Sequence, residues 1–241
     1  MAKFVTKTGF TIGLLILLMS VPALGASINK SIKIGDGEES GGATSVNGSI
    51  TVGENAVVTG GLTTVNGTIR IDSGASIEGA KTVNGDIRVS DNVTAEDLTT
   101  VNGSITLGEK TRVDRDVSAV NGKIELDTGS SVSRGLSNVN GRIELTAAEV
   151  GGNIETVNGD VDLVDGSVVK GNLVVEKPGG WGWDENKSRK PRIVIGPGSR
   201  IEGTIELERE VELFISESAE VGGVSGVMSM DDAVRFSGDS P

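Results

Sequence analysis

Apolar and polar positions alternate in short segments that recur along the chain at a nearly constant interval. In segments 50–52, 69–71 and 124–126, two aliphatic residues flank one polar or charged residue. This two-residue period is typical of a β-strand with one buried face, and no copy holds ten or more residues with helical spacing. The pattern therefore predicts short strands separated by turns.

The tripeptide Val-Asn-Gly marks the interval between these segments. It occurs seven times, at a nearly constant spacing of about 18 residues. An eighth, upstream unit at 28–34 (INKSIKI) matches 46–52 (VNGSITV) at the same spacing. A repeat of this length, made only of strands and turns, predicts one coil of a solenoid. The asparagines of the seven tripeptides are Asn47, Asn66, Asn84, Asn102, Asn121, Asn140 and Asn158.

The predicted fold is all-β, a single-stranded parallel β-helix of about ten rungs, each of roughly 18–20 residues. Equivalent residues of successive rungs are expected to stack at ~4.8 Å, the spacing of paired strands. Val46, Val65, Val83 and their successors are expected to form an interior ladder, as are the columns that begin at Ile50 and Val52. A second interior column is predicted from Val58, Ile77, Val93, Val113, Val132, Val150 and Val169.

The Asn-Gly pairs are interpreted as corners between strands, because both residues tolerate a positive φ. Their stacked amides are also expected to bond from rung to rung, as in cross-β ladders. The alternative is that Asn47 to Asn158 line a ligand groove. Further turns are predicted after the strands, at 53–55, 72–74, 91–92 and 127–129.

The pattern divides the chain into five parts. Residues 1–25 form a predicted signal peptide, and 26–176 form a β-helix of eight repeats. Residues 177–192 lack apolar periodicity and predict a projecting loop. Two further rungs follow at 193–226, where 195–204 and 215–224 align position by position. Residues 227–241 are expected to be a C-terminal cap or a disordered tail.

The predicted signal peptide has the three parts of a secretion signal. Lys3 and Lys7 provide the positive start, 12–19 the short apolar core, and 23–25 the small residues for cleavage. The sequence thus predicts a protein of the bacterial periplasm or cell surface, with no transmembrane anchor once the signal is removed. Removal changes the net charge from −12 to about −14, which argues against nucleic acid as a partner.

Several segments resemble the coils of bactofilins, which are polymer-forming bacterial cytoskeletal proteins. They are 194–205 (VIGPGSRIEGTI), 169–173 (VKGNL) and 53–62 (GENAVVTGGL). The resemblance covers most of 27–226 and implies a right-handed parallel β-helix that self-associates. The uniform Val-Asn-Gly repeats are also similar to the adhesin-type β-helices of exported bacterial proteins. Bactofilins are typically cytoplasmic, and the predicted signal peptide departs from that pattern.

A left-handed helix is the alternative for handedness. Val46, Val52 and Val58 are evenly spaced by six, like the hexapeptide repeats of certain acyltransferases. The period of the Val-Asn-Gly units, however, slips by one position from some copies to the next. Those enzymes also usually require a catalytic histidine, and this chain has none. The right-handed form is therefore favoured.

The composition limits the available chemistry. The chain has no histidine and no cysteine, which excludes the usual nucleophile–base pairs and zinc sites. The best acidic cluster is Glu125, Glu144 and Asp162, which share one outward position in three successive rungs. Lys123 and Arg142 precede two of them by two positions. The cluster is a candidate for a calcium site or an acid/base pair, and surface ion pairing is the favoured interpretation.

The predicted loop holds both tryptophans, Trp181 and Trp183. Two exposed rings in a glycine-rich loop predict contact with a sugar or a partner protein. The alternative is that they fold back and cover one side of the stack. The basic end of the loop, at 187–192, favours contact with an acidic surface.

Together these features predict a non-enzymatic, exported scaffold without a cofactor. It is expected to self-associate as a homo-oligomer or filament, or to contact the cell envelope. An adhesin-like glycan- or protein-binding module that uses Trp181 and Trp183 is the alternative. A carbohydrate-active enzyme that uses the acidic cluster is the third hypothesis.

Overall fold

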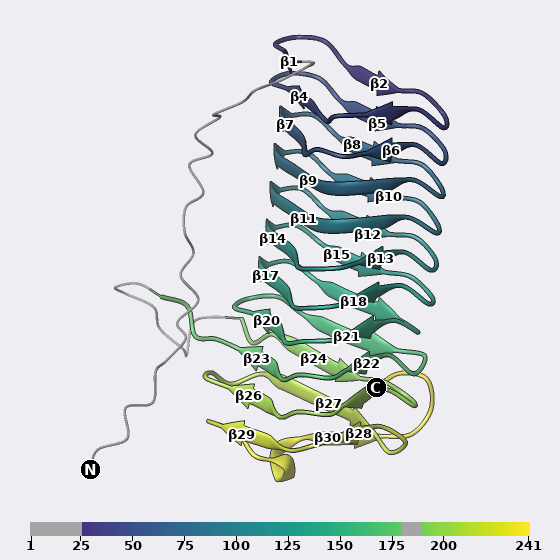
Figure 1. The fold of residues 1–241 in the computed structure, drawn as a ribbon. Coiled ribbons are helices and arrows are strands. Elements are labelled where there is room, and N and C mark those ends of the chain that lie inside the picture. Colours follow the sequence, from purple (N-terminus) through teal and green to yellow (C-terminus); the bar gives the residue numbers. More distant parts are fainter. Residues whose placement is uncertain (1–25, 180–188) are drawn as a thin grey trace, which may run out of the picture.

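The computed structural model describes residues 26–179 and 189–241. In these residues the chain forms a β-solenoid of about ten turns, and all strand pairs are parallel (Figure 1). The prediction of an all-β parallel β-helix is thus confirmed.

One side of the solenoid is a sheet of eleven strands, counted over the described residues. Each contributes one rung, and equivalent residues lie in register, as in the pairing of Ile50 with Ile69. The strands are β2 (Ile32–Ile34), β5 (Ile50–Val52), β8 (Ile69–Ile71), β10 (Ile87–Val89), β12 (Ile105–Leu107), β15 (Ile124–Leu126), β18 (Ile143–Thr146), β21 (Val161–Val164), β24 (Arg192–Ile195), β27 (Glu212–Ser216) and β30 (Val234–Phe236).

The other strands of the described residues belong to a second parallel sheet that completes each rung. Two-residue strands follow the outer turns: β3 (Glu39–Ser40), β6 (Val57–Val58), β13 (Arg112–Val113), β16 (Ser131–Val132), β19 (Glu149–Val150), β22 (Val168–Val169), β25 (Arg200–Ile201) and β28 (Glu220–Val221). Strands that lead to the Asn-Gly corners, or occupy the same place, are β1 (Ala26–Ser27), β4 (Ala43–Ser45), β7 (Leu62–Asn66), β14 (Val117–Asn121), β17 (Leu136–Asn140), β20 (Ile154–Thr156), β23 (Leu173–Val175), β26 (Ile205–Leu207) and β29 (Val224–Gly226). In β9 (Ser76–Asn84) and β11 (Thr94–Asn102), the strand after the outer turn and the strand that leads to the Asn-Gly corner form one continuous strand.

The interior is filled by columns of aliphatic side chains. Ile50, Val52 and their counterparts from the third to the tenth strand of the eleven-stranded sheet are at most 4 % exposed. A third column lies on the opposite sheet, where Ala43, Leu62 and Ala80 pair in register and are buried. Because each rung is too thin to bury its apolar face alone, the columns bury it jointly with the neighbouring rungs.

The valines of the Val-Asn-Gly units do not form the predicted interior ladder. Val46 and Val65 are half-buried on the outer surface, whereas the residues before them, Ser45 and Thr64, are fully buried. The reason is the alternation of the strand, since Leu62 and Thr64 point inward and Val65 must then point outward. That part of the sequence interpretation was wrong.

The second interior column also differs at one position. Val58, Ile77, Val113 and their successors pair as predicted, but Ala95 occupies this column in place of Val93. Val93 lies two residues before Ala95, in the turn, and is also buried. Because both residues are apolar and two positions apart, periodicity alone does not show which of them belongs to the column, and the prediction named Val93.

Glycine is needed at the Asn-Gly corners because the rungs approach each other closely there. A positive φ is not the general reason for glycine at these corners. A Cβ on Gly103 or Gly122 would overlap the carbonyl oxygen of the equivalent glycine one rung earlier. Positive φ angles recur instead at the outer turns, as at Asn55 (55°), Gly74 (74°) and Asn92 (58°). The predicted outer turns therefore use the expected chemistry, whereas the corner glycines follow from packing.

The last rungs lie beyond the segment 180–188. Ile195 pairs with Ile215, and Ile201 with Val221, which matches the alignment of these two segments in the sequence. After β29 the chain forms a short 3₁₀ helix, η2 (Met230–Asp232), and then β30, which pairs with β27. The end of the chain thus adds one strand to the stack and covers it.

Candidate functional site

A ladder of asparagine side chains follows the outer corner of the stack. Each Nδ2 donates to the Oδ1 of the asparagine one rung earlier, from Asn47 bonded to Asn29 at 2.8 Å to Asn158 bonded to Asn140 at 2.9 Å. The intervening bonds are 2.7–3.0 Å long. All eight amides thus point the same way, and the corner positions are used for bonding between rungs.

A buried arginine closes the ladder at its acceptor end. Arg209 is 1 % exposed, and its Nη1 donates to the Oδ1 of Asn158 at 2.8 Å and to the carbonyl of Val157 at 3.2 Å. Its Nη2 donates to the carbonyl of Arg189 at 2.8 Å. The guanidinium therefore ties the last Val-Asn-Gly corner to Arg189, near the far end of the segment 177–192, which interrupts the repeats and is called the inserted segment below.

Inside the corner, polar side chains satisfy the carbonyls that the close approach buries. The hydroxyl of Thr64 donates to the carbonyl of Gly48 at 2.9 Å, and that of Thr100 to Gly85 at 3.0 Å. Asn138 does the same through its amide, to Gly122 at 2.8 Å. Buried polar groups with partners of this kind stabilise one register of the stack.

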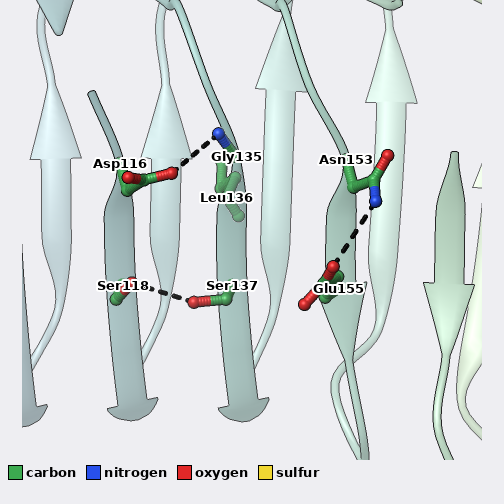
Figure 2. Close-up of a pocket in the computed structure, with 7 residues that line it drawn as sticks. All are labelled: Asp116, Ser118, Gly135, Leu136, Ser137, Asn153 and Glu155. Atoms are coloured by element: carbon green, nitrogen blue, oxygen red, sulfur yellow. Dashed lines mark hydrogen bonds between the residues drawn. The ribbon is translucent and has the colours of Figure 1, made fainter. Parts of the chain in front are cut away.

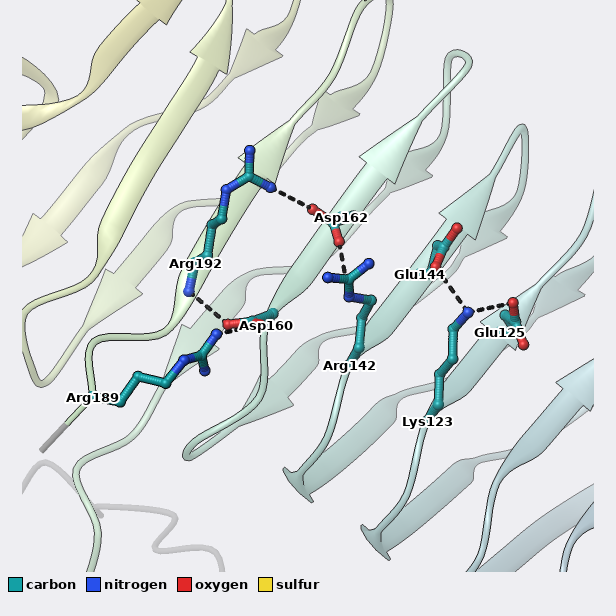
Figure 3. A network of polar contacts seen from close by, with 8 residues as sticks. All are labelled: Lys123, Glu125, Arg142, Glu144, Asp160, Asp162, Arg189 and Arg192. Carbon is teal, nitrogen blue, oxygen red and sulfur yellow. Dashed lines mark hydrogen bonds and ion pairs between the residues drawn. The ribbon is translucent and has the colours of Figure 1, made fainter. Parts of the chain in front are cut away.

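The acidic cluster predicted from the sequence lies in one outward column. Glu125 pairs in register with Glu144, and Glu144 with Asp162, on β15, β18 and β21 (Figure 3). Lys123 lies between the first two, contacting Glu125 and bonding to Glu144 at 3.0 Å. Arg142 lies 3.3 Å from Asp162. Basic side chains therefore separate the stacked carboxylates.

Basic residues beside the inserted segment complete this network. Arg192 lies 3.5 Å from Asp162, and its backbone N–H donates to Asp160 at 2.8 Å. Arg189 also pairs with Asp160 (Figure 3). Burial works to raise the pKa of Asp160, but the hydrogen bonds from Arg189 and Arg192 outweigh it and hold the pKa below its usual value.

Asp162 behaves in the opposite way. Burial raises the pKa of its carboxyl, and the attraction of Arg142 and Arg192 offsets this only in part. For Lys123, burial works to lower the pKa, but hydrogen bonds with Glu125 and Glu144 outweigh it and raise the pKa. These side chains form ion pairs with one another. In the described part of the chain, no group of three or more acidic residues is arranged to hold a metal ion.

The tryptophans predicted to bind a ligand, Trp181 and Trp183, lie outside the described residues. The described base of that segment is fixed to the stack. Besides the contacts of Arg189 and Arg192, Lys190 forms an ion pair with Glu210. The positive charges that the sequence assigned to binding an acidic surface are thus used, at these three positions, within the chain.

A shallow polar depression lies on the other sheet, at the start of β14, β17 and β20 (Figure 2). Its volume is roughly 430 Å³. The lining residues are Asp116, Ser118, Gly135, Leu136, Ser137, Asn153 and Glu155. The sequence pattern did not predict a site at this position. Its signal is a column, one position before each strand, in which Gly135 falls between Asp116 and Asn153.

The comparisons with known proteins leave the family open. No protein-family model, no curated protein and no solved structure matches this chain. Within the described residues, no helix is long and apolar enough to cross a membrane. Function is therefore inferred from the stack and from the chemistry of its surfaces.

Proposed function

We propose that this protein is a non-catalytic, exported scaffold that acts as a rigid rod, through contacts with copies of itself or with the cell envelope. The observation that carries the proposal is the unbroken register of the eleven-stranded sheet from β2 to β30. At ~4.8 Å per strand, this sheet extends for about 48 Å. A stack filled throughout by interlocked aliphatic columns holds its ends at a fixed separation.

The first rung of the stack provides a route to self-association. Among the described residues, β2 and β30 are the terminal strands of the eleven-stranded sheet. Ile32 donates to the carbonyl of Ser49, and Ile34 accepts from Gly53. By the alternation of a strand, the backbone groups of Lys33 point to the open side. An unpaired edge of this kind is a template for another strand.

The resemblance of several coils to bactofilins supports this reading, because bactofilins polymerise. The predicted signal peptide supports export. The acidic column supports a non-catalytic role, since Glu125, Glu144 and Asp162 each form an ion pair with a lysine or arginine. A general acid and base instead need carboxyl groups that are free to exchange protons with a substrate.

Light scattering of purified residues 26–241 over a wide concentration range tests the proposal, together with sedimentation of the protein with isolated bacterial envelopes. We expect oligomers, sedimentation, or both. Replacing Lys33 by Pro removes the free N–H of the edge and should reduce assembly. A protein that stays monomeric and does not sediment with envelopes would overturn the proposed function.

A further inference from the structure

We propose that the polar depression at the start of β14, β17 and β20 is a binding site for an uncharged, hydroxyl-rich glycan. The inference goes beyond the scaffold role and does not depend on self-association. It rests on a glycine that the fold does not require, on carboxylates without ionic partners, and on the side chains that surround them (Figure 2).

Gly135 creates the depression. It lies in one column with Asp116 before it and Asn153 after it, so the missing side chain leaves a hollow between two polar ones. The backbone does not demand glycine here, because its φ is not positive and an added Cβ would meet its nearest neighbours at 3.4 Å. This distinguishes Gly135 from the corner glycine Gly122, where a Cβ would overlap a carbonyl.

The two carboxylates of the depression belong to Asp116 and Glu155. Among the described residues, no ion pair involves either of them. Asp97, one rung before Asp116 in the same column, is by contrast bound by Lys81 at 3.3 Å and by Arg115 at 3.1 Å. Asp116 uses one oxygen, Oδ1, to accept the N–H of Gly135 at 3.0 Å. Each carboxylate thus keeps acceptor capacity toward the hollow.

The remaining side chains determine the class of ligand. The hydroxyls of Ser118 and Ser137 lie 2.9 Å apart on the floor, and the amide of Asn153 lies 3.5 Å from Glu155. Acceptors dominate, so the site favours a ligand rich in donors and disfavours an anion. Sugar hydroxyls supply such donors without a charge.

The surroundings favour a chain of sugars over a small enclosed ligand. The depression has the volume of an ordinary ligand cavity, which is typically about 300–1,000 Å³, but it is open to solvent, whereas such cavities enclose most of the ligand. Two positions beyond Ser118 and Ser137 on the same outward face lie Val120 and Val139, both half-buried. They provide an apolar strip for the C–H faces of further sugar units. We therefore infer that a glycan strand lies on this sheet in the direction of β14 and β17, from the depression towards Val120 and Val139.

Affinity electrophoresis tests the site, with residues 26–241 run through gels that contain a soluble neutral β-glucan, chitosan or polygalacturonate. We expect the neutral glucan to retard the protein and the acidic polymer to leave it unaffected. Gly135→Val should weaken retention at least tenfold by filling the hollow. The double variant Asp116→Asn/Glu155→Gln should weaken it about tenfold by replacing charged acceptors with neutral ones.

Gly61→Val is the matched control. Gly61 occupies the same column, far from the depression, and an added Cβ there would meet no atom within 4 Å. Its retention should equal that of the unaltered protein. The inference is overturned if no neutral glucan is retained, if only chitosan is retained, or if Gly135→Val behaves like Gly61→Val. Oligomer formation and sedimentation with envelopes are separate measurements, so a failure here leaves the scaffold role intact.

Discussion

The rungs that carry Val-Asn-Gly and the rungs after the inserted segment have the same fold but are held together differently. In the first region, identical side chains stack on one another, as in the ladder from Asn29 to Asn158. In the second, the interior columns continue, but outside them single contacts replace the repeated ones, such as the guanidinium of Arg192 at 5.0 Å from the ring centre of Phe214. Outside the interior, the repeated region thus shares its stabilising contacts among many rungs, whereas the last rungs use individual residues.

The outward column of the eleven-stranded sheet shows the same contrast. It changes from Glu125, Glu144 and Asp162 to Val194, Phe214 and Val234 without a change of register. The interior positions remain aliphatic as far as Leu213 and Ile215. The stack thus accommodates both charged and apolar residues at these outward positions, while the inward positions determine the fold.

The largest effect is expected at the corners of the Val-Asn-Gly region. Gly122→Ala would place a Cβ against the carbonyl of Gly103 and separate two rungs, so we expect a loss of about 3 kcal/mol in the free energy of unfolding. Urea denaturation followed by circular dichroism measures it. Gly223→Ala is the control in the last rungs, where the Cβ would contact only Thr204 at 3.9 Å. Equal effects at both positions would contradict the requirement for close approach.

The junction between the two regions should be the next most sensitive. Arg209→Met keeps the length of the buried side chain but removes the donors to Asn158, Val157 and Arg189. We expect a loss of about 2 kcal/mol by the same measurement. Arg200→Met, which removes an exposed partner 3.4 Å from Glu202, should cost less than about 1 kcal/mol. If the two variants lose the same free energy of unfolding, Arg209 does not join the two regions.

A smaller effect is expected within the asparagine ladder. Asn102→Ala breaks two amide bonds, to Asn84 and from Asn121. The ladder is exposed, so each bond contributes little and we expect a loss of about 1 kcal/mol. Asn29→Ala, at the open end, breaks one bond and should cost about half as much. If Asn102→Ala and Asn29→Ala have the same stability, the ladder does not stabilise the fold.

The smallest effect concerns pH at the two aspartates beside the insertion. Because the pKa of Asp162 is raised above 3.8 in the folded state, its contribution to stability falls as the pH rises through the range above 3.8. The pKa of Asp160 is lowered, so its contribution is present above pH 3.8 and is lost as the pH falls below that value.

Thermal unfolding between pH 3 and 7 separates the two aspartates. Asp162→Asn should remove the decline at rising pH, and Asp160→Asn the decline at falling pH, each by no more than about 1 kcal/mol. The prediction is contradicted if Asp162→Asn removes the decline at falling pH and Asp160→Asn the decline at rising pH. Burial would then not dominate at Asp162, nor ion pairing at Asp160.

The repeat made most of the stack predictable. The strands that begin at Ile50 and Ile69, the outer turn at Asn55 and the in-register column of Glu125 and Glu144 are all found as expected. The predicted interior ladder of Val46 and Val65 was wrong. The Asn-Gly corner changes which positions point inward, and the sequence does not show where that change occurs. The depression around Gly135 was missed, since a glycine in a turn gives no sign of whether the backbone requires it.

The sequence by itself determined the period, the parallel stack and the residues that meet along its axis. It could do so because a repeat of nearly constant length places the same side chain at the same point of each coil. The tertiary structure alone decided what depends on distances between rungs. Only there does a glycine carbonyl lie where a Cβ would fall at Gly122, and only there does Arg209 reach Asn158, far earlier in the chain.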